Sequence, residues 1–131
     1  MRTYQRLDHE TEMTAREIVD AAYMVHRELG PGLLESTYEK SMAYELRSRG
    51  LNVETQLSIP VQYKELFIPY GYRLDMLVES RVIVEVKAVE QLMSIHTAQT
   101  LTYLRMLGKR LGLLVNFNVP LVKNGMKRVI L

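Results

Sequence analysis

Two carboxylates and one lysine in the middle of the chain have the chemistry of a divalent-cation site. Asp75 lies in the mainly apolar segment 72–78, and Glu85 and Lys87 lie in the apolar segment 82–87. Carboxylate oxygens suit Mg²⁺ or Mn²⁺, which take one or two carboxylates, several waters and the phosphate oxygens of a substrate. A lysine beside such a cation can orient a water and stabilise the charge that develops on a phosphate during hydrolysis.

These two segments are expected to pair as a hairpin around a three-residue loop, 79–81. In that register Asp75 faces Glu85, and the apolar residues face apolar partners. The two carboxylates would have Cβ atoms about 5 Å apart and would repel each other. A proton, a basic neighbour or a divalent cation is needed to offset that repulsion. Lys87 projects from the same face as Glu85, because it lies two residues further along the strand.

The same pattern has a second interpretation. The sequence Val-Glu-Val-Lys over residues 84–87 is also typical of an amphipathic edge strand whose Glu and Lys face water. With Asp75 across the hairpin, both interpretations stay open. Glu35 favours a site, because it falls in the first turn of a predicted helix and in line with the inward stripe of Tyr38 and Met42. The alternative for Glu35 is a purely stabilising role at the helix start.

The periodicity of the remaining segments predicts a layered, mixed α/β domain in the order α-α-β-β-β-α-β-β. Residues 1–12 are polar and are expected to form a flexible leader before a single domain over residues 13–131. Thr14 and Glu17 are expected to cap the first helix, with Asn124-Gly125 as a turn before the last strand. The expected helices are 14–29, 33–49 and 95–107, and the expected strands are 57–63, 72–78, 82–86, 111–117 and 127–131.

Composition excludes several classes of protein. The chain has 131 residues and no cysteine, so it has neither disulfides nor thiolate metal sites. No apolar run is long enough to span a bilayer, and the start lacks a signal-type apolar core, so we expect a cytoplasmic protein without a membrane partner.

Charge is distributed unevenly along the chain. Six of the 17 basic residues and none of the 15 acidic ones fall in residues 91–131. This segment therefore carries +6 and the rest −4, which indicates either a polyanionic partner or solvated surface cations.

The predicted helix 95–107 places Gln99 and Tyr103 on one face, since they are four residues apart. Tyr103 is either a core aromatic or a contact to a phosphate or base. His96 is interpreted as partly exposed and non-catalytic, like His26 and His9. Three further aromatic residues near the hairpin could stack on unpaired bases, although packing on the sheet is the favoured interpretation. They are Tyr63, Tyr70 and Tyr72.

Several ordered motifs resemble a known family. Gly32, Glu35 and Tyr38 match the pattern of the GxxExxY proteins. Asp75 followed by Glu85-Val-Lys87 resembles the D…ExK segment of that family. Two later blocks, around Gln99 to Tyr103 and around Asn116 to Asn118, also resemble it, so the likeness extends over nearly the whole chain from about residue 14.

The GxxExxY group is similar to the PD-(D/E)XK nuclease superfamily, which includes restriction endonucleases, phage exonucleases and archaeal Holliday-junction resolvases. This resemblance implies a restriction-endonuclease-like core, a central mixed β-sheet flanked by helices. It also implies that Asp75, Glu85 and Glu35 act at a Mg²⁺ or Mn²⁺ site and that Lys87 is catalytic. Gln99 and Tyr103 match the Q-x-x-x-Y motif of the exonuclease-like branch. Leu74 stands where the family signature has proline.

The resulting expectation is a metal-dependent nuclease that acts on DNA in preference to RNA. The residues expected to contact nucleic acid are Gln99, Tyr103, Arg105, Lys109 and Arg110. The alternative is a module on the same fold that binds nucleic acid or a partner protein without cutting. A homodimer is also expected. So small a domain carries one catalytic site, and a symmetric pair would present two such sites to the two strands of a nucleic acid.

Overall fold

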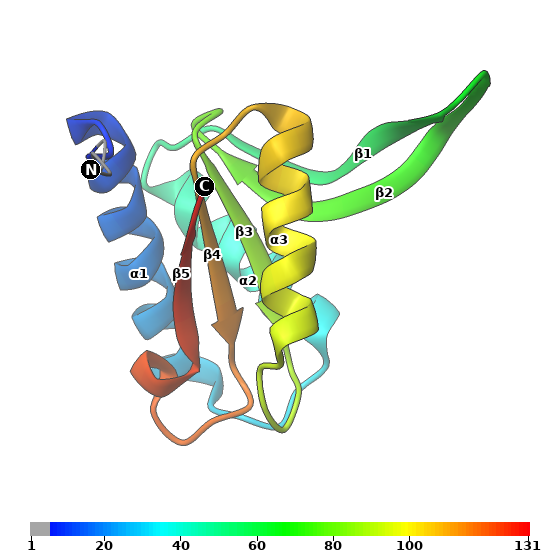
Figure 1. Ribbon diagram of the computed structural model, residues 1–131. Coiled ribbons are helices and arrows are strands. Elements are labelled where there is room, and N and C mark those ends of the chain that lie inside the picture. Colours follow the sequence, from blue (N-terminus) through cyan, green and yellow to red (C-terminus); the bar gives the residue numbers. More distant parts are fainter. Residues whose placement is uncertain (1–5) are drawn as a thin grey trace, which may run out of the picture.

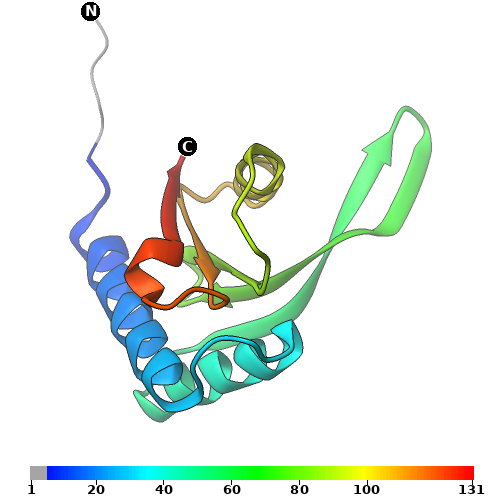
Figure 2. The same cartoon turned by 90° about the horizontal axis from the view of Figure 1, so that it is seen from below.

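The computed structural model describes residues 6–131 as a sheet covered by helices on both faces. Helices α1 and α2 lie against one face of the sheet, and α3 lies against the other (Figures 1 and 2). The helices are α1 His9–Leu29, α2 Glu35–Ser48 and α3 Ser94–Leu107, with a short 3₁₀ helix η1 at Val122–Gly125. The strands are β1 Val53–Tyr63, β2 Leu66–Val78, β3 Val82–Lys87, β4 Leu111–Asn116 and β5 Met126–Ile130.

The five strands form one mixed sheet in the order β1-β2-β3-β4-β5. Strands β3 and β4 are parallel, and every other neighbouring pair is antiparallel. A parallel pair needs a long crossover, which α3 provides. The predicted fold class and element order are therefore confirmed.

The sheet separates two apolar clusters, which explains why β3 is buried along nearly its whole length. Val84 and Val86 face α1 and α2, together with Tyr38 and Met42. Ile83 faces α3 in the second cluster. Because strand side chains alternate, Glu85 and Lys87 belong to the face of Ile83.

Helix α1 begins earlier than predicted. Asp8 caps it by accepting hydrogen bonds from the backbone N–H of Thr11 (2.7 Å) and from its hydroxyl (3.0 Å). Thr14 is buried in the helix, so the predicted cap of Thr14 and Glu17 is wrong. Residues 9–12, which the sequence placed in the leader, are helical, while residues 1–5 lie outside the described part. Within residues 6–131, no helix has the length and apolar character needed to cross a membrane.

The tyrosine of the GxxExxY motif closes the turn between α1 and α2. Tyr38 is fully buried and stacks on Phe117, with ring centroids 4.5 Å apart. Its hydroxyl donates to the carbonyl of Gly30 (2.5 Å) and accepts from the backbone N–H of Leu33 (3.1 Å). These two bonds satisfy backbone groups in a turn where positive φ angles at Gly30 (67°) and Gly32 (97°) favour glycine.

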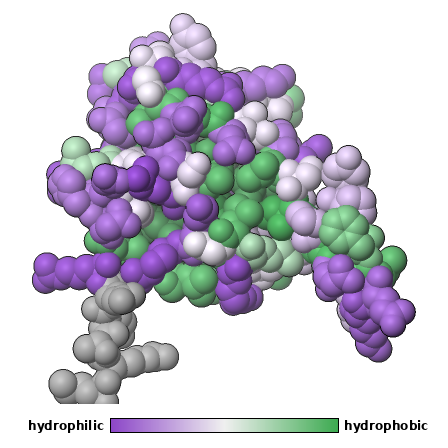
Figure 3. Space-filling view, turned by 90° about the horizontal axis from the view of Figure 1, so that it is seen from above, coloured by the Kyte–Doolittle hydropathy of each residue, from purple (hydrophilic) through white to green (hydrophobic). Residues whose placement is uncertain are grey.

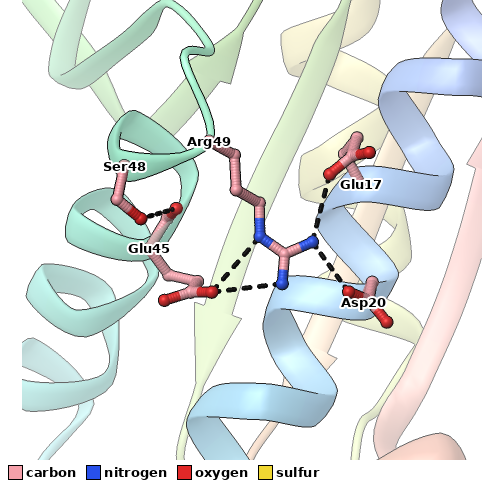
Figure 4. Close-up of polar contacts among 5 residues, drawn as sticks. All are labelled: Glu17, Asp20, Glu45, Ser48 and Arg49. Carbon is pink, nitrogen blue, oxygen red and sulfur yellow. Dashed lines mark hydrogen bonds and ion pairs between the residues drawn. The ribbon is translucent and has the colours of Figure 1, made fainter.

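A charged cluster joins the C-terminal end of α2 to the middle of α1 (Figure 4). The guanidinium of Arg49, just after α2, bonds to Glu17 (3.0 Å) and Asp20 (2.7 Å) of α1. It also bonds to Glu45 of α2 (3.1 Å). These carboxylates hold the pKa of Arg49 above its ordinary value. The cluster therefore has a structural role, and Glu17 belongs to it rather than to a helix cap.

Strands β1 and β2 are longer than predicted and extend past the sheet as a two-stranded arm (Figures 1 and 2). The two strands of the arm are joined by a turn at Lys64-Glu65, since Tyr63 pairs with Leu66. Pro69 and Gly71 interrupt the alternation of the returning strand, so the sequence pattern missed it. The expected turn at 124–125 is instead the end of η1.

Candidate functional site

The site lies in a fork where β2 and β3 separate. The two strands pair through Met76 and Val84 and through the two pairs nearer the loop, so the predicted register is confirmed for these three pairs, while the expected pairing of Asp75 with Glu85 is not part of the ladder. The pairing stops before Asp75. There the Asp75 carboxylate Oδ2 accepts a hydrogen bond from the backbone N–H of Val86 (2.8 Å). The carboxylate of Asp75 thus lies between the two strands, close to Glu85.

Glu85 is buried to an unusual degree for an acidic side chain. Only 5% of its surface is exposed, and it lies between the apolar residues of β3. Within residues 6–131, its Oε1 is the one fully buried side-chain polar atom that lacks a hydrogen-bond partner. An unpaired buried polar atom costs about 1–3 kcal/mol, and more when the group is charged. A partner for this oxygen would remove that cost.

Burial and charge both disfavour ionisation of Glu85. Burial raises the pKa of the Glu85 carboxyl well above its usual range, and the neighbouring Asp75 carboxyl raises it further. The positive charge of Lys87 lowers the pKa again in part. Lys87 is half-buried at the end of β3, where its strand partner is Asn116. The three residues predicted as the chemical core therefore lie within electrostatic reach of one another.

The two carboxylates fit a hard divalent cation. An orphaned buried oxygen beside a second carboxylate is a suitable donor set for Mg²⁺ or Mn²⁺, which need only one or two protein carboxylates. Within residues 6–131, no group of three or more acidic, histidine or cysteine side chains could hold a metal. The described residues therefore offer two carboxylates to such a cation, whose other ligands would be waters or substrate oxygens.

Glu35 does not join Asp75 and Glu85. It is exposed at the first position of α2. One turn later, Glu39 is half-buried, and its pKa is raised by burial first and then by the negative charges of Asp75 and Glu35. The sequence analysis missed Glu39, although it lies four residues after Glu35 on the same helix face.

Gln56 contacts Glu39 and lies opposite Asp75 on the neighbouring strand. Its Nε2 donates a hydrogen bond to Oε1 of Glu39. On β1 it lies between Thr55 and Leu57, whose partners on β2 are the two neighbours of Asp75. Gln56 has a φ of 53°, which is unusual for a residue other than glycine. The sequence gives no signal for this backbone irregularity, so a role for Gln56 could not be predicted.

Of the two residues of the Q-x-x-x-Y motif, Tyr103 lies within electrostatic reach of the acidic pair. It is 9% exposed and packs edge to face on Tyr72, with ring centroids 5.6 Å apart. Burial and the charges of Glu85 and Asp75 raise the pKa of its hydroxyl. Gln99 is exposed.

The basic residues expected to contact nucleic acid lie away from the fork. Lys109 and Arg110 precede β4 at Leu111, which pairs with the first residue of β3. Lys87 is the last residue of β3, so these cations lie at the opposite end of the sheet. Arg110 also donates hydrogen bonds to the carbonyls of Leu131 and Arg6. Arg105 is exposed near the C-terminal end of α3, where it bonds to Thr102.

Other polar residues around the site are structural. Asn116 is buried and bonds to both backbone groups of Val89, which holds the loop after Lys87. Met93 donates its backbone N–H to the His96 ring (2.9 Å), and the His26 ring bonds to the carbonyl of Val119 (2.8 Å).

Two of the three tyrosines near the hairpin do not pack on the sheet. The favoured packing interpretation is wrong for Tyr63 and Tyr70, which are 61% and 80% exposed on the arm.

A family model described as the PD-(D/E)XK nuclease superfamily matches residues 12–129. No curated protein and no solved structure matches the chain. The family match covers nearly the whole chain, including every strand of the sheet and the fork that holds Asp75 and Glu85. This chain belongs to the PD-(D/E)XK nuclease superfamily.

Proposed function

We propose that this protein is a divalent-metal-dependent nuclease of the GxxExxY group, acting on DNA in preference to RNA. The buried, unpartnered Oε1 of Glu85 beside Asp75 is the observation that carries the proposal. A buried carboxyl pair is costly unless a proton or a cation offsets its charge. The DNA preference rests on the resemblance to restriction endonucleases, phage exonucleases and Holliday-junction resolvases.

Asp75 and Glu85 would hold Mg²⁺ or Mn²⁺, and a cation there supplies positive charge against the scissile phosphate. Lys87, on the same strand face as Glu85, would orient the attacking water and stabilise the charge that develops on the phosphate. The backbone N–H of Val86 keeps Asp75 turned toward β3. Tyr103 lies on the α3 side of the acidic pair, within electrostatic reach of Glu85 and Asp75.

Cleavage assays with single-stranded, duplex and branched DNA test this proposal. The parent protein should cut at least one substrate in Mg²⁺ or Mn²⁺ and none in a chelator. Lys87→Ala should lower the rate at least about 100-fold, which is the order of effect for loss of one transition-state contact. The matched control is Lys123→Ala, an exposed lysine of η1. Cleavage by Lys87→Ala at the parent rate would refute the mechanism.

A non-cleaving module that binds nucleic acid or a partner protein is the second candidate. It is favoured by the absence, within residues 6–131, of a third acidic or histidine side chain placed to hold a metal together with Asp75 and Glu85. Calorimetry with Mn²⁺ separates the two candidates. Salt-sensitive nucleic-acid binding without cation binding at the acidic pair would identify the binding module.

We also propose that two copies associate through the arm. One face of the arm carries exposed apolar side chains, and a two-stranded hairpin without a third layer is only marginally stable in water. A second copy related by a two-fold axis would cover this face with the same surface. The residues of this arm face are Tyr63, Leu66, Ile68 and Tyr70.

A further inference from the structure

A groove of about 810 Å³ runs between α2 and the part of β1 and β2 from which the arm extends. Helix α2 contributes residues spaced three and four apart, which therefore share one helix face. The space-filling view shows the arm standing apart from the body, with hydrophobic side chains on the body beside it (Figure 3). The residues that line the groove are Ser36, Glu39, Lys40, Ala43, Tyr44, Arg47, Ser48, Thr55, Gln56 and Arg73.

The chemistry of this lining matches a phosphate backbone with its bases. Lys40, Arg47 and Arg73 bring three positive charges against the single carboxylate of Glu39. Hydroxyl and amide groups of the lining add donors for phosphate oxygens. Tyr44 is 75% exposed, so its ring has a face available for stacking. Single-stranded nucleic acids bind in grooves that combine cations with exposed aromatic rings.

The groove lies next to Asp75 of the acidic pair. Glu39 lines it and is within electrostatic reach of Asp75. Gln56 also lines it, next to Asp75 across the β1–β2 ladder. A strand lying in the groove would therefore pass beside Asp75, the residue at which β2 and β3 separate.

The C-terminal cations are poorly placed for the same task. Lys109 and Arg110 lie at the far end of β4. Arg128 is paired with Glu12 of α1 (2.7 Å). The asymmetry of charge in the sequence therefore does not locate the surface that leads to the fork.

We propose that this groove binds a single strand of nucleic acid and guides it to Asp75 and Glu85. The proposal rests on the proposed nuclease function and names the strand-binding surface of that site. The groove has the volume of a small-molecule site, about 300–1,000 Å³, which suits a few nucleotides and is too small to enclose a duplex. Lys40, Arg47 and Arg73 contact phosphates, and Tyr44 stacks on a base.

Fluorescence anisotropy with a labelled DNA single strand of about 20 nucleotides tests the proposal, without divalent cation and in a Lys87→Ala background. The groove variant is Lys40→Ala with Arg73→Ala. The control is Lys123→Ala with Lys127→Ala, which removes the same charge from exposed residues of η1 and β5. Circular dichroism verifies that each variant is folded.

We expect the groove variant to bind about tenfold more weakly than the control pair. The slope of log affinity against log salt concentration should be shallower by about 1.4 in the groove variant, since each lost phosphate contact to a single strand contributes about 0.7 to the slope. Tyr44→Ala should weaken binding at least about fivefold without changing the salt slope, because stacking is uncharged. Equal losses in both double variants, or equally tight binding of a duplex with the same dependence on Lys40 and Arg73, would overturn the proposal.

The outcome is separable from that of the proposed function, because no step of this assay requires cleavage. A protein that binds through the groove and never cuts would refute the nuclease and leave the groove assignment standing. A protein that cuts, but whose groove variant binds single strands as tightly as the parent does, would refute the groove assignment alone.

Discussion

Glu85 occupies a position that is unfavourable for an ionised carboxylate in the metal-free protein. It is nearly fully buried, Asp75 lies beside it, and Oε1 has no hydrogen-bond partner within the described residues. A proton or a divalent cation can each relieve this, and the two compete for the same oxygens. The competition links cation binding to pH and to the free energy of unfolding.

The metal-free protein should lose stability as pH rises. The pKa of Glu85 is raised in the folded state, so between the usual carboxylate range and the raised value the folded protein binds more protons than the unfolded chain. The free energy of unfolding then falls with increasing pH. Urea unfolding in a chelator at about pH 5 and about pH 8 measures this fall. Glu85→Gln, a neutral isostere, should reduce the fall, and a variant with the full pH dependence of the parent would contradict this account.

The two glutamates of α2 should differ in their effect on cation affinity. Glu39 is within electrostatic reach of Asp75, whereas Glu35 is exposed at the helix start. We expect Glu39→Gln to weaken Mn²⁺ binding about three- to tenfold through the loss of a nearby negative charge. Glu35→Gln is the matched control and should change the affinity less than about twofold. Calorimetry measures both, and a larger effect at Glu35 would support the acidic role first expected for it.

At the scale of elements, α2 has two functions on two faces. Its buried face places Tyr38, Met42 and Leu46 in the core. Its other face lines the groove with Glu39, Lys40 and Arg47. The motif tyrosine thus belongs to the packing side, because its hydroxyl closes the turn between α1 and α2.

Tyr38→Phe should therefore destabilise the fold and spare the metal site. The variant leaves the carbonyl of Gly30 and the N–H of Leu33 without their partner, which costs about 1–2 kcal/mol. Urea unfolding in a chelator measures the loss, and calorimetry should give an unchanged Mn²⁺ affinity. Tyr23→Phe, at a residue 41% exposed, is the control and should leave stability unchanged. Unaltered stability together with weakened cation binding would instead place Tyr38 in the site.

The hairpin and its register could be predicted from sequence because they follow from local alternation. Apolar residues on both sides of the loop pair in one register, which brings Asp75 toward Glu85. The Glu39–Gln56 contact joins residues that are distant in sequence, and it depends on a backbone irregularity without a sequence signal. The positions of Lys109 and Arg110 could not be predicted for a related reason, since composition does not tell which end of a strand a residue occupies.

At the scale of the whole molecule, the fork results from the arm. Strand β2 leaves β3 after three residue pairs and continues with β1 beyond the sheet (Figure 1). The divergence ends the backbone ladder at Asp75 and frees the N–H of Val86 for its carboxylate. The arm and the acidic pair are therefore two consequences of one departure from regular sheet pairing.

Substitutions on the arm should change the oligomeric state without unfolding the domain. Leu66→Ser with Tyr70→Ser removes two exposed apolar side chains of the arm face. Light scattering at micromolar concentration should give a dimeric mass for the parent and a monomeric mass for the variant. The control is Tyr44→Ser, an equally exposed ring outside the arm. A monomeric parent would refute the dimer.

The most direct test of the central claim is a crystal structure of the protein soaked in Mn²⁺, examined by anomalous diffraction. We expect one strong anomalous peak in the fork between β2 and β3, bonded to carboxylate oxygens of both Asp75 and Glu85. The same peak should be lost in Glu85→Gln. A fork without a peak, or a Mn²⁺ ion bound elsewhere and untouched by these two carboxylates, would contradict the assignment.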